Sequence, residues 1–168
     1  MNTLSKTRTR TGDPKKVQLA IPKGSLEEPT LQLFKDAGFP FRTSDRGSVC
    51  TTDDPDLEVL LLRPQEIARY ITQNDPGSMD LGITGWDWIT ECGVQSAIEE
   101  LGNFQYSKRS SKPTRWALAV PEESSMQQPE DLRGGRIATE IINTTRRWFQ
   151  KRNIPIEVEY SWGATEAK

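Results

Sequence analysis

Three short loops, each between an apolar stretch and a helical pattern, carry residue types that bind phosphate. These loops are Lys23-Gly24-Ser25, Thr84-Gly85 and the segment 139–145. A helix that begins after such a loop offers unpaired backbone amides and the positive end of its dipole, and both favour phosphate. Lys23 adds a point charge, and Gly24 allows a ligand to approach the backbone closely. Each loop taken singly is equally compatible with a purely structural turn, because every α/β protein contains such turns.

Arg63 is a further candidate, because it directly follows the apolar stretch 57–62 and directly precedes Pro64. A charge at the end of a buried strand is either solvated or bound to an anion, and the sequence leaves both open. The neighbours Arg146 and Arg147 lie on one helical pattern, so we expect at least one to face solvent. The five tryptophans are expected in the core or between lobes rather than as surfaces for stacking bases.

The elements that must position these residues alternate between strand and helix. Strands are predicted at 17–22, 57–62, 79–83, 116–120, 136–139 and 156–160. Helices are predicted after Ser25, from Pro64, after Gly85, near Pro129 and over 144–151. This alternation is typical of an α/β fold with a largely parallel sheet, in which the turns at the carboxyl ends of the strands share one edge. The sequence therefore predicts that Lys23, Arg63 and the Thr84-Gly85 turn face one cleft.

The first helix has its own start and stop signals. Ser25 and Glu28 have the spacing of a capping box, in which Ser25 is the N-cap, and Gly38 is the expected stop. Residues 102–114 are rich in Gly, Ser and Pro and interrupt the alternation. We therefore expect four parts, which are a disordered polar arm (1–16), a first α/β lobe (17–104), a hinge (105–114) and a second α/β lobe (115–168).

Composition excludes several functional classes. The chain has 22 basic and 24 acidic residues and a net charge of −2, so nothing indicates nucleic acid or an anionic membrane as a partner. It contains no histidine, and Cys50 and Cys92 lack metal-ligand spacing, so zinc sites and histidine acid–base chemistry are unsupported. Both cysteines are expected to be reduced, small apolar residues. No apolar run is long enough for a membrane span, and we expect a cytoplasmic location.

Six segments, in this order, resemble the ATP phosphoribosyltransferase family. They are AIPKGSL (20–26), DPDLEVLLLRPQEI (54–67), MDLGITGWD (79–87), RWALAVPE (115–122), DLRGGRIATE (131–140) and SWGATEAK (161–168). The resemblance runs from Val17 to Lys168, and the combination of LRP, DLGITG and GRIAT at these separations is highly specific.

The resemblance implies a two-lobed α/β fold similar to type II periplasmic binding proteins, with the active site in the cleft. It implies transfer of the phosphoribosyl group of phosphoribosyl pyrophosphate to N1 of ATP, the first step of histidine biosynthesis, with Mg²⁺ bound to the pyrophosphate. It also implies a homo-oligomer, in some members with a histidyl-tRNA-synthetase-like regulatory subunit.

The same resemblance implies a set of substrate-binding positions. These are Lys23, Gly24, Ser25, Arg63, Thr84, Gly85, Asp87, Arg115, Thr139, Thr144 and Glu166. Many members have Arg where Ser25 stands, so one charged contact is missing here. Neither a catalytic base nor a protein metal ligand can be named.

The family continues into a further strand and a Thr-Gly-rich loop that holds the ribose 5-phosphate, and this sequence contains neither. We therefore expect a fragment with an incomplete second lobe and no turnover of its own. Two alternatives remain open. One is a non-catalytic small-molecule binding module of the periplasmic-binding-protein fold, and the other is a non-catalytic partner of a complete subunit.

Overall fold

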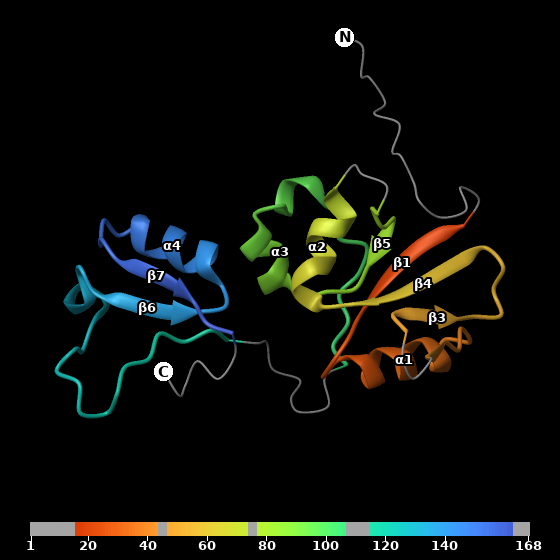
Figure 1. The fold of residues 1–168 in the computed structure, drawn as a ribbon, viewed down its shortest axis with the longest axis horizontal. Coiled ribbons are helices and arrows are strands. Elements are labelled where there is room, and N and C mark those ends of the chain that lie inside the picture. The colour runs from red at the N-terminus through yellow and green to blue at the C-terminus, as the bar shows by residue number, and fades with distance from the viewer. Residues whose placement is uncertain (1–15, 44–46, 74–76, 107–114, 163–168) are drawn as a thin grey trace, which may run out of the picture. The chain divides into compact units, whose positions relative to one another are not determined.

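The computed structural model describes residues 16–43, 47–73, 77–106 and 115–162. These residues belong to two compact units, 1–111 and 112–168, each with its own sheet. Most of the predicted arm (1–16) and of the predicted hinge (105–114) therefore lies outside the described residues, as does Glu166. The predicted α/β class, with two separate strand–helix series, is confirmed (Figure 1).

The first unit is built on a five-stranded sheet in the order β2-β3-β4-β1-β5. Its strands are β1 (Val17–Pro22), β2 (Arg42–Thr43), β3 (Val49–Thr51), β4 (Leu57–Leu62) and β5 (Leu81–Gly82). The three strands β4, β1 and β5 are parallel neighbours, and Ala20 pairs with Leu60 on one side and Gly82 on the other. β2 and β3 extend the sheet in antiparallel fashion and were not predicted from the sequence.

Helices cover both faces of this sheet, which explains why β1 is apolar from Leu19 to Pro22. Leu19 and Ile21 point to the face where α1 (Glu27–Asp36) packs, and they join a cluster with Val59 and Leu61. Ala20 points to the opposite face, where it joins Ile67 of α2 (Pro64–Thr72) and Met79. A strand buried on both sides reads as a continuous apolar run. The remaining elements of this unit are α3 (Trp86–Cys92) and the 3-10 turn η1 (Gln95–Ala97).

The start of α1 differs from the predicted capping box. The N-cap is Leu26, and Ser25 provides no cap. Instead, the amide of Gly24 donates to Oε2 of Glu27 at 3.3 Å, so Glu27 has the place that the sequence pattern gave to Glu28. The end of α1 agrees with the prediction. Gly38 has φ +88°, and the amides of Gly38 and Phe39 donate back to the carbonyls of Lys35 and Phe34 at 3.1 and 2.8 Å.

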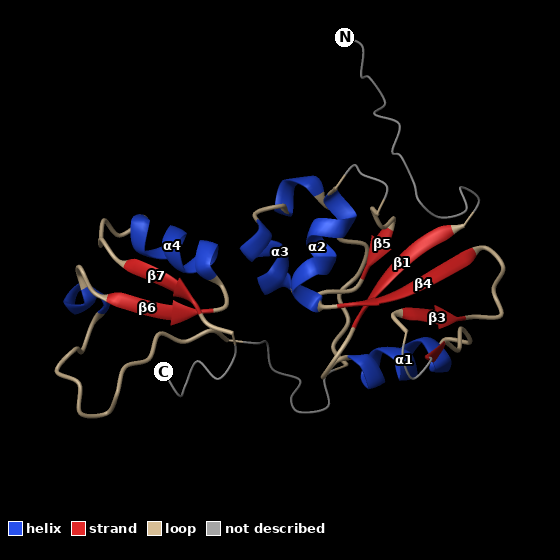
Figure 2. Cartoon of the chain, in the orientation of Figure 1, coloured by secondary structure: helices blue, strands red, loops and turns tan. Residues whose placement is uncertain are grey.

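The second unit contains a two-stranded parallel sheet of β6 (Arg136–Thr139) and β7 (Glu157–Tyr160), with α4 (Ile142–Gln150) beside it (Figure 2). Its core is the cluster Leu132, Phe149 and Ile154. The predicted helix near Pro129 is a single 3-10 turn, η2 (Pro129–Leu132), closed by a capping box between Gln128 and Asp131.

Four predicted elements need correction. The predicted strand 116–120 is not formed, because neither described sheet includes it, and a strand requires a neighbour for its backbone groups. The predicted strand 79–83 shortens to Leu81–Gly82, since the amide of Gln18 donates to the Asp80 carboxylate at 2.9 Å rather than to a backbone carbonyl. α4 begins two residues earlier than predicted, and β7 begins one residue later.

Candidate functional site

Two cations follow adjacent parallel strands at one edge of the first unit. Pro22 and Leu62 are paired residues at the ends of β1 and β4, so Lys23 and Arg63 are the next residues of neighbouring strands. The amide of Lys23 continues the ladder by donating to the carbonyl of Leu62 at 2.7 Å. Both side chains are exposed, and among the described residues no carboxylate forms an ion pair with either. This edge therefore presents two positive charges to solvent.

The Thr84-Gly85 turn belongs to the same edge. β5 pairs with β1, and beyond β5 the amide of Ile83 donates to the carbonyl of Ala20 at 3.0 Å. The hydroxyl of Thr84 donates to the carbonyl of Pro64 at 2.7 Å, which ties this turn to the first turn of α2. Thr84 thus has a structural hydrogen bond in addition to its predicted contact with substrate, and its oxygen can still accept one.

Two longer helices, α1 and α2, begin at this edge, and both leave backbone amides for an anion. Their N-cap residues, Leu26 and Arg63, provide no side-chain cap. Two nearby backbone amides already donate to carboxylates. The amide of Gly24 donates to Glu27, and the amide of Trp88 donates to Asp87 at 3.0 Å. The edge is therefore suited to an anion, and these two carboxylates limit how many amides it can offer.

Two glycines at this edge have a defined steric role. Gly24 has φ +88°, a conformation that L side chains rarely adopt, and a Cβ there would meet nothing within 4 Å. The backbone at Gly24 is consequently open to a ligand. At Gly85, a Cβ would lie 2.2 Å from Oδ1 of Asp87, so Gly85 is what allows the Asp87 carboxylate to fold over the start of α3.

Thr30 and Tyr106 support the start of α1, although sequence reasoning did not select them. The fully buried hydroxyl of Thr30 donates to the carbonyl of Leu26 at 2.6 Å, so the Tyr106 hydroxyl, 3.0 Å away, donates to Thr30. Burial raises the pKa of Tyr106 above its usual value, and the bond to Thr30 opposes only part of that rise. Tyr106 therefore stays protonated at neutral pH. Tyr106 belongs to no recognisable motif, so the sequence did not indicate its hydrogen bond to Thr30.

The remaining predicted positions lie in the second unit. Thr139 is buried at the end of β6, and its oxygen accepts from the amide of Ile141 at 3.2 Å. Thr144 lies on α4 and accepts from Nη2 of Arg147 at 3.2 Å. Arg115 is exposed and, contrary to prediction, does not open a strand. Thr139 and the start of α4 form the carboxyl edge of this second sheet.

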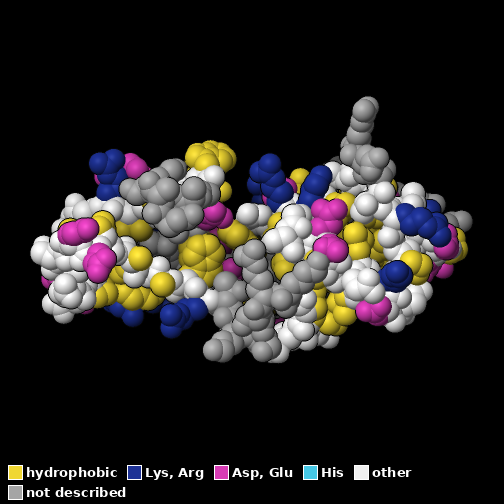
Figure 3. Space-filling model, turned by 90° about the horizontal axis from the view of Figure 1, so that it is seen from below, with side chains coloured by type: hydrophobic (Ala, Val, Ile, Leu, Met, Phe, Trp, Pro, Cys, Tyr) yellow, Lys and Arg dark blue, Asp and Glu magenta, His cyan; other side chains and the backbone are white. Residues whose placement is uncertain are grey.

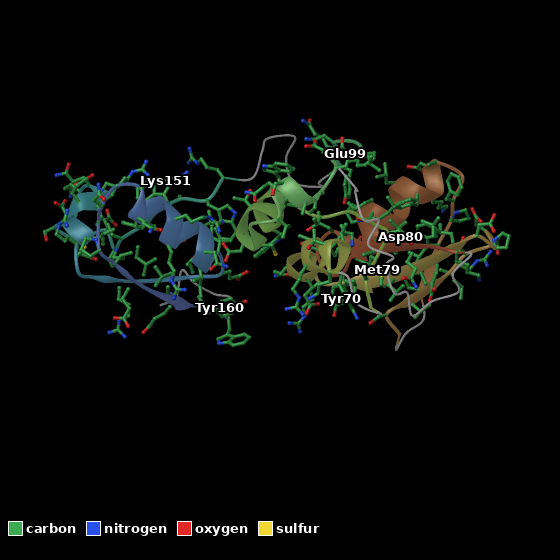
Figure 4. All side chains as sticks on the ribbon, turned by 90° about the horizontal axis from the view of Figure 1, so that it is seen from above. Tyr70, Met79, Asp80, Glu99, Lys151 and Tyr160 are labelled. Atoms are coloured by element: carbon green, nitrogen blue, oxygen red, sulfur yellow. The ribbon has the colours of Figure 1, made fainter. Side chains whose placement is uncertain are left out.

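Two hollows of the first unit lie away from Lys23 and Arg63. One, of 690 Å³, is formed around the amino end of β4 by residues that include Asp53, Asp54 and Glu58. The other, of 370 Å³, is lined by residues that include Tyr70 and Met79 (Figure 4). Carboxylates disfavour phosphate in the first hollow, and the second offers no cation. Basic and acidic side chains are interspersed on the face that Figure 3 shows.

The described ranges contain neither a cluster of metal-ligand residues nor a helix that could span a membrane. No group of three or more His, Cys, Asp or Glu residues is arranged there to hold a metal ion. None of the helices there has the length and apolar character needed to cross a membrane. Cys50 and Cys92 are free thiols, and burial is the main cause that raises the pKa of both.

Known proteins resemble this chain over most of its length. The family model described as HisG, ATP phosphoribosyltransferase, matches residues 63–168. The ATP phosphoribosyltransferase of Koribacter versatilis is 49% identical over 153 residues, which are 91% of this chain and 51% of that protein. That of Chlorobaculum parvum is 45% identical over 152 residues, which are 90% of this chain and 50% of that protein.

A solved structure resembles this chain in fold. It is the ATP phosphoribosyl transferase (HisG:HisZ) complex from Thermotoga maritima, which superposes with a TM-score of 0.66 at 25% identity and covers 89% of this chain and 66% of that chain. The chain spans about half the length of the curated relatives it matches.

Proposed function

Because this chain belongs to the ATP phosphoribosyltransferase family, we propose that it forms a substrate-binding part of a glycosyltransferase that moves the phosphoribosyl group of phosphoribosyl pyrophosphate to N1 of ATP. This reaction is the first step of histidine biosynthesis and releases pyrophosphate. The observation that carries the proposal is the edge of the first unit, where Lys23 and Arg63 follow paired strands beside the starts of α1 and α2.

In this reaction the bond from C1 of ribose to the pyrophosphate oxygen breaks, and its electron pair leaves with pyrophosphate. The N1 lone pair of adenine forms the new bond to C1. Charge therefore grows on the leaving group, and cations placed beside it stabilise the transition state. Lys23 supplies a point charge, Arg63 supplies a planar set of donors, and the open backbone at Gly24 lets phosphate oxygens reach amides.

The donor set also fits a magnesium ion that arrives on the substrate. Cations and amides bind phosphate oxygens, and Mg²⁺ usually keeps several waters and binds through substrate phosphates. When bound, the ion neutralises charge on the departing pyrophosphate. Lys23 and Arg63 would bind pyrophosphate oxygens. For the second unit by itself, the family resemblance proposes Thr139, Thr144, Arg115 and Glu166 as substrate-binding positions.

Binding of phosphoribosyl pyrophosphate with Mg²⁺ to the 168-residue chain, measured by calorimetry, tests this proposal. Lys23→Ala should weaken binding by about 1–3 kcal/mol, the range for a hydrogen bond to a charged group. Lys35→Ala is the matched control, because Lys35 is an exposed lysine in the last turn of α1 and should leave the affinity unchanged. Equal affinities of wild type and Lys23→Ala would remove Lys23 from the site.

A transfer assay with ATP, phosphoribosyl pyrophosphate and Mg²⁺ separates catalysis from binding alone. Product formation that Lys23→Ala lowers would establish the enzyme. Binding without product would favour the non-catalytic binding module, or a chain that works only with a partner. Adding a HisZ-like subunit then tests the partner, since the structural neighbour is a HisG:HisZ complex. We propose the cytoplasm, where these substrates occur, and a homo-oligomer whose size gel filtration would report.

A further inference from the structure

One tryptophan of the second unit is almost entirely in solvent. Trp162 is 86% exposed, whereas Trp148 of the same unit is 36% exposed and has the Arg152 guanidinium 3.5 Å from its ring centroid. Of the two places expected for the tryptophans, the core or between lobes, this exposure excludes the core of the unit for Trp162. An indole that large leaves much apolar surface in water, so its exposure is a cost that a ligand can remove.

Two contacts from the preceding residues position Trp162. The rings of Trp162 and Tyr160 form a T-shaped pair, with centroids 4.7 Å apart and planes at 74°. Ser161, between the two aromatic residues, is fully buried, and its amide donates to the carbonyl of Thr139 at 3.0 Å. Trp162 therefore stands on a backbone anchored to β6. A positioned ring loses little conformational entropy when a ligand binds it.

The position of Trp162 is that of a ligand contact in a parallel sheet. It follows the carboxyl end of β7, next to the carboxyl end of β6 and the turn into α4. Ligands of parallel α/β sheets bind at this edge. Tyr160, which positions it, lies at the same end of β7 (Figure 4). Thr139, which the resemblance places in the substrate wall, is the residue hydrogen-bonded to Ser161.

We propose that Trp162 stacks its indole face on the adenine ring of ATP, and that Tyr160, through its T-shaped contact with the indole, is the positioning residue. This inference rests on the proposed function and assigns the base-binding part of it. Stacking suits the reaction because it contacts the flat faces of adenine. The edge of the ring, which carries N1, then remains accessible, so N1 can attack C1 of ribose.

The test compares ligands with and without a base. Binding of ATP and of inorganic tripolyphosphate, each with Mg²⁺, would be measured by calorimetry on the full 168-residue chain. Trp162→Ala should weaken ATP binding roughly 5- to 150-fold, the range for loss of one base–aromatic stack. Tripolyphosphate binding should not change. Trp162→Phe keeps a smaller ring and should retain most of the affinity, and Tyr160→Ala should give an intermediate loss.

Trp148→Ala is the matched control, because it removes an indole of the same unit near the far end of α4. It should leave ATP binding unchanged. Circular dichroism would confirm that each variant is folded. Unchanged ATP affinity in Trp162→Ala overturns the inference, and so does an equal loss for ATP and tripolyphosphate, which would indicate a structural role. A wild-type chain that binds phosphoribosyl pyrophosphate but not ATP also overturns the inference about Trp162. The proposed function has a separate test, because it fails if Lys23→Ala leaves the affinity for phosphoribosyl pyrophosphate unchanged.

Discussion

At the scale of single residues, the first unit has two exposed cations where two neighbouring strands end. Two other arginines of the described residues are instead paired with carboxylates. Arg42 forms a two-point ion pair with Asp53 at 3.1 Å, and Arg136 pairs with Glu159 at 3.0 Å. Lys23 and Arg63 have no such partner among the described residues. An anion can therefore bind Lys23 and Arg63 without first breaking an ion pair with a described carboxylate.

Arg63→Gln should weaken binding of tripolyphosphate by about 1–3 kcal/mol, because it removes a charge-assisted donor but keeps a side chain of similar length. The difference from wild type should shrink as salt is raised, since an exposed cation is screened. Calorimetry at two salt concentrations measures both effects. Arg42→Gln, which removes an exposed arginine of β2, is the control and should bind as wild type does. A loss in Arg63→Gln that does not depend on salt would indicate altered folding rather than a lost charge.

Cys50 provides a pH-dependent test. Burial, with a smaller effect of Glu27, raises its pKa above the ordinary value of 9.0. The folded state therefore disfavours the thiolate, and the stability linked to Cys50 is fully present below pH 9.0 and is lost as pH rises through the raised pKa. In a Cys92→Ser background, Cys50 should react slowly with a thiol reagent at pH 8 and rapidly after unfolding. Rapid labelling of the folded chain would show that Cys50 is accessible.

At the scale of elements, the close approach of α2 to β5 determines where the candidate edge lies. Gly82 of β5 leaves the space in which Ile67 and Ile71 of α2 pack, and Thr84 links the following turn to Pro64. Arg63 is the N-cap of this same helix. A shift of α2 would therefore move one of the two cations relative to the other.

Gly82→Ala should destabilise the first unit by about 1–3 kcal/mol, because the new Cβ would lie 2.5 Å from Cγ2 of Ile67 and 2.7 Å from Cδ1 of Ile71. Urea unfolding followed by circular dichroism measures the change. Gly102→Ala is the control, since a Cβ there meets only Phe104 at an ordinary 3.6 Å. A double variant with Ile71→Val should recover part of the loss, and a single variant as stable as wild type would show that α2 moves freely.

At the scale of the whole molecule, the two units differ in the size of their cores. Among the described residues, the first has five strands with apolar clusters on both faces of the sheet, whereas the second has two strands and one small cluster. Two-stranded sheets are only marginally stable without further packing. Buried apolar area is the main source of folding free energy, so the units should not be equally stable.

Hydrogen exchange should therefore show stronger amide protection in β1 and β4 than in β6 and β7, and the second unit should unfold at lower denaturant concentration. Phe149→Ala removes a buried side chain from the second core. It should lower the free energy of unfolding of the second unit alone, by about 3–5 kcal/mol, or unfold that unit completely. Val59→Ala in the first core serves as the reciprocal variant. A single cooperative transition that both variants shift equally would mean that the units fold as one.

Much of the fold could be predicted from local pattern. The runs 17–22 and 57–62 coincide with β1 and β4, because short, largely apolar runs of this length are typical of buried strands. Gly38 ends α1 as predicted, since only a residue without Cβ adopts its positive φ easily. Family membership was equally accessible, because several short motifs at fixed separations identify it. Each of these properties depends on residues that are neighbours in the sequence.

Only the tertiary structure decided the features that depend on distant partners. The segment 116–120 is an apolar run typical of a strand, yet no described strand pairs with it. Leu26 rather than Ser25 is the N-cap of α1, and Glu27 rather than Glu28 accepts a backbone amide. The hydroxyl of Thr84 is hydrogen-bonded to Pro64, twenty residues away. Exposure of Trp162 could not be read from the sequence, because burial depends on which distant side chains pack against a residue, whereas conformational preference is set by its immediate neighbours.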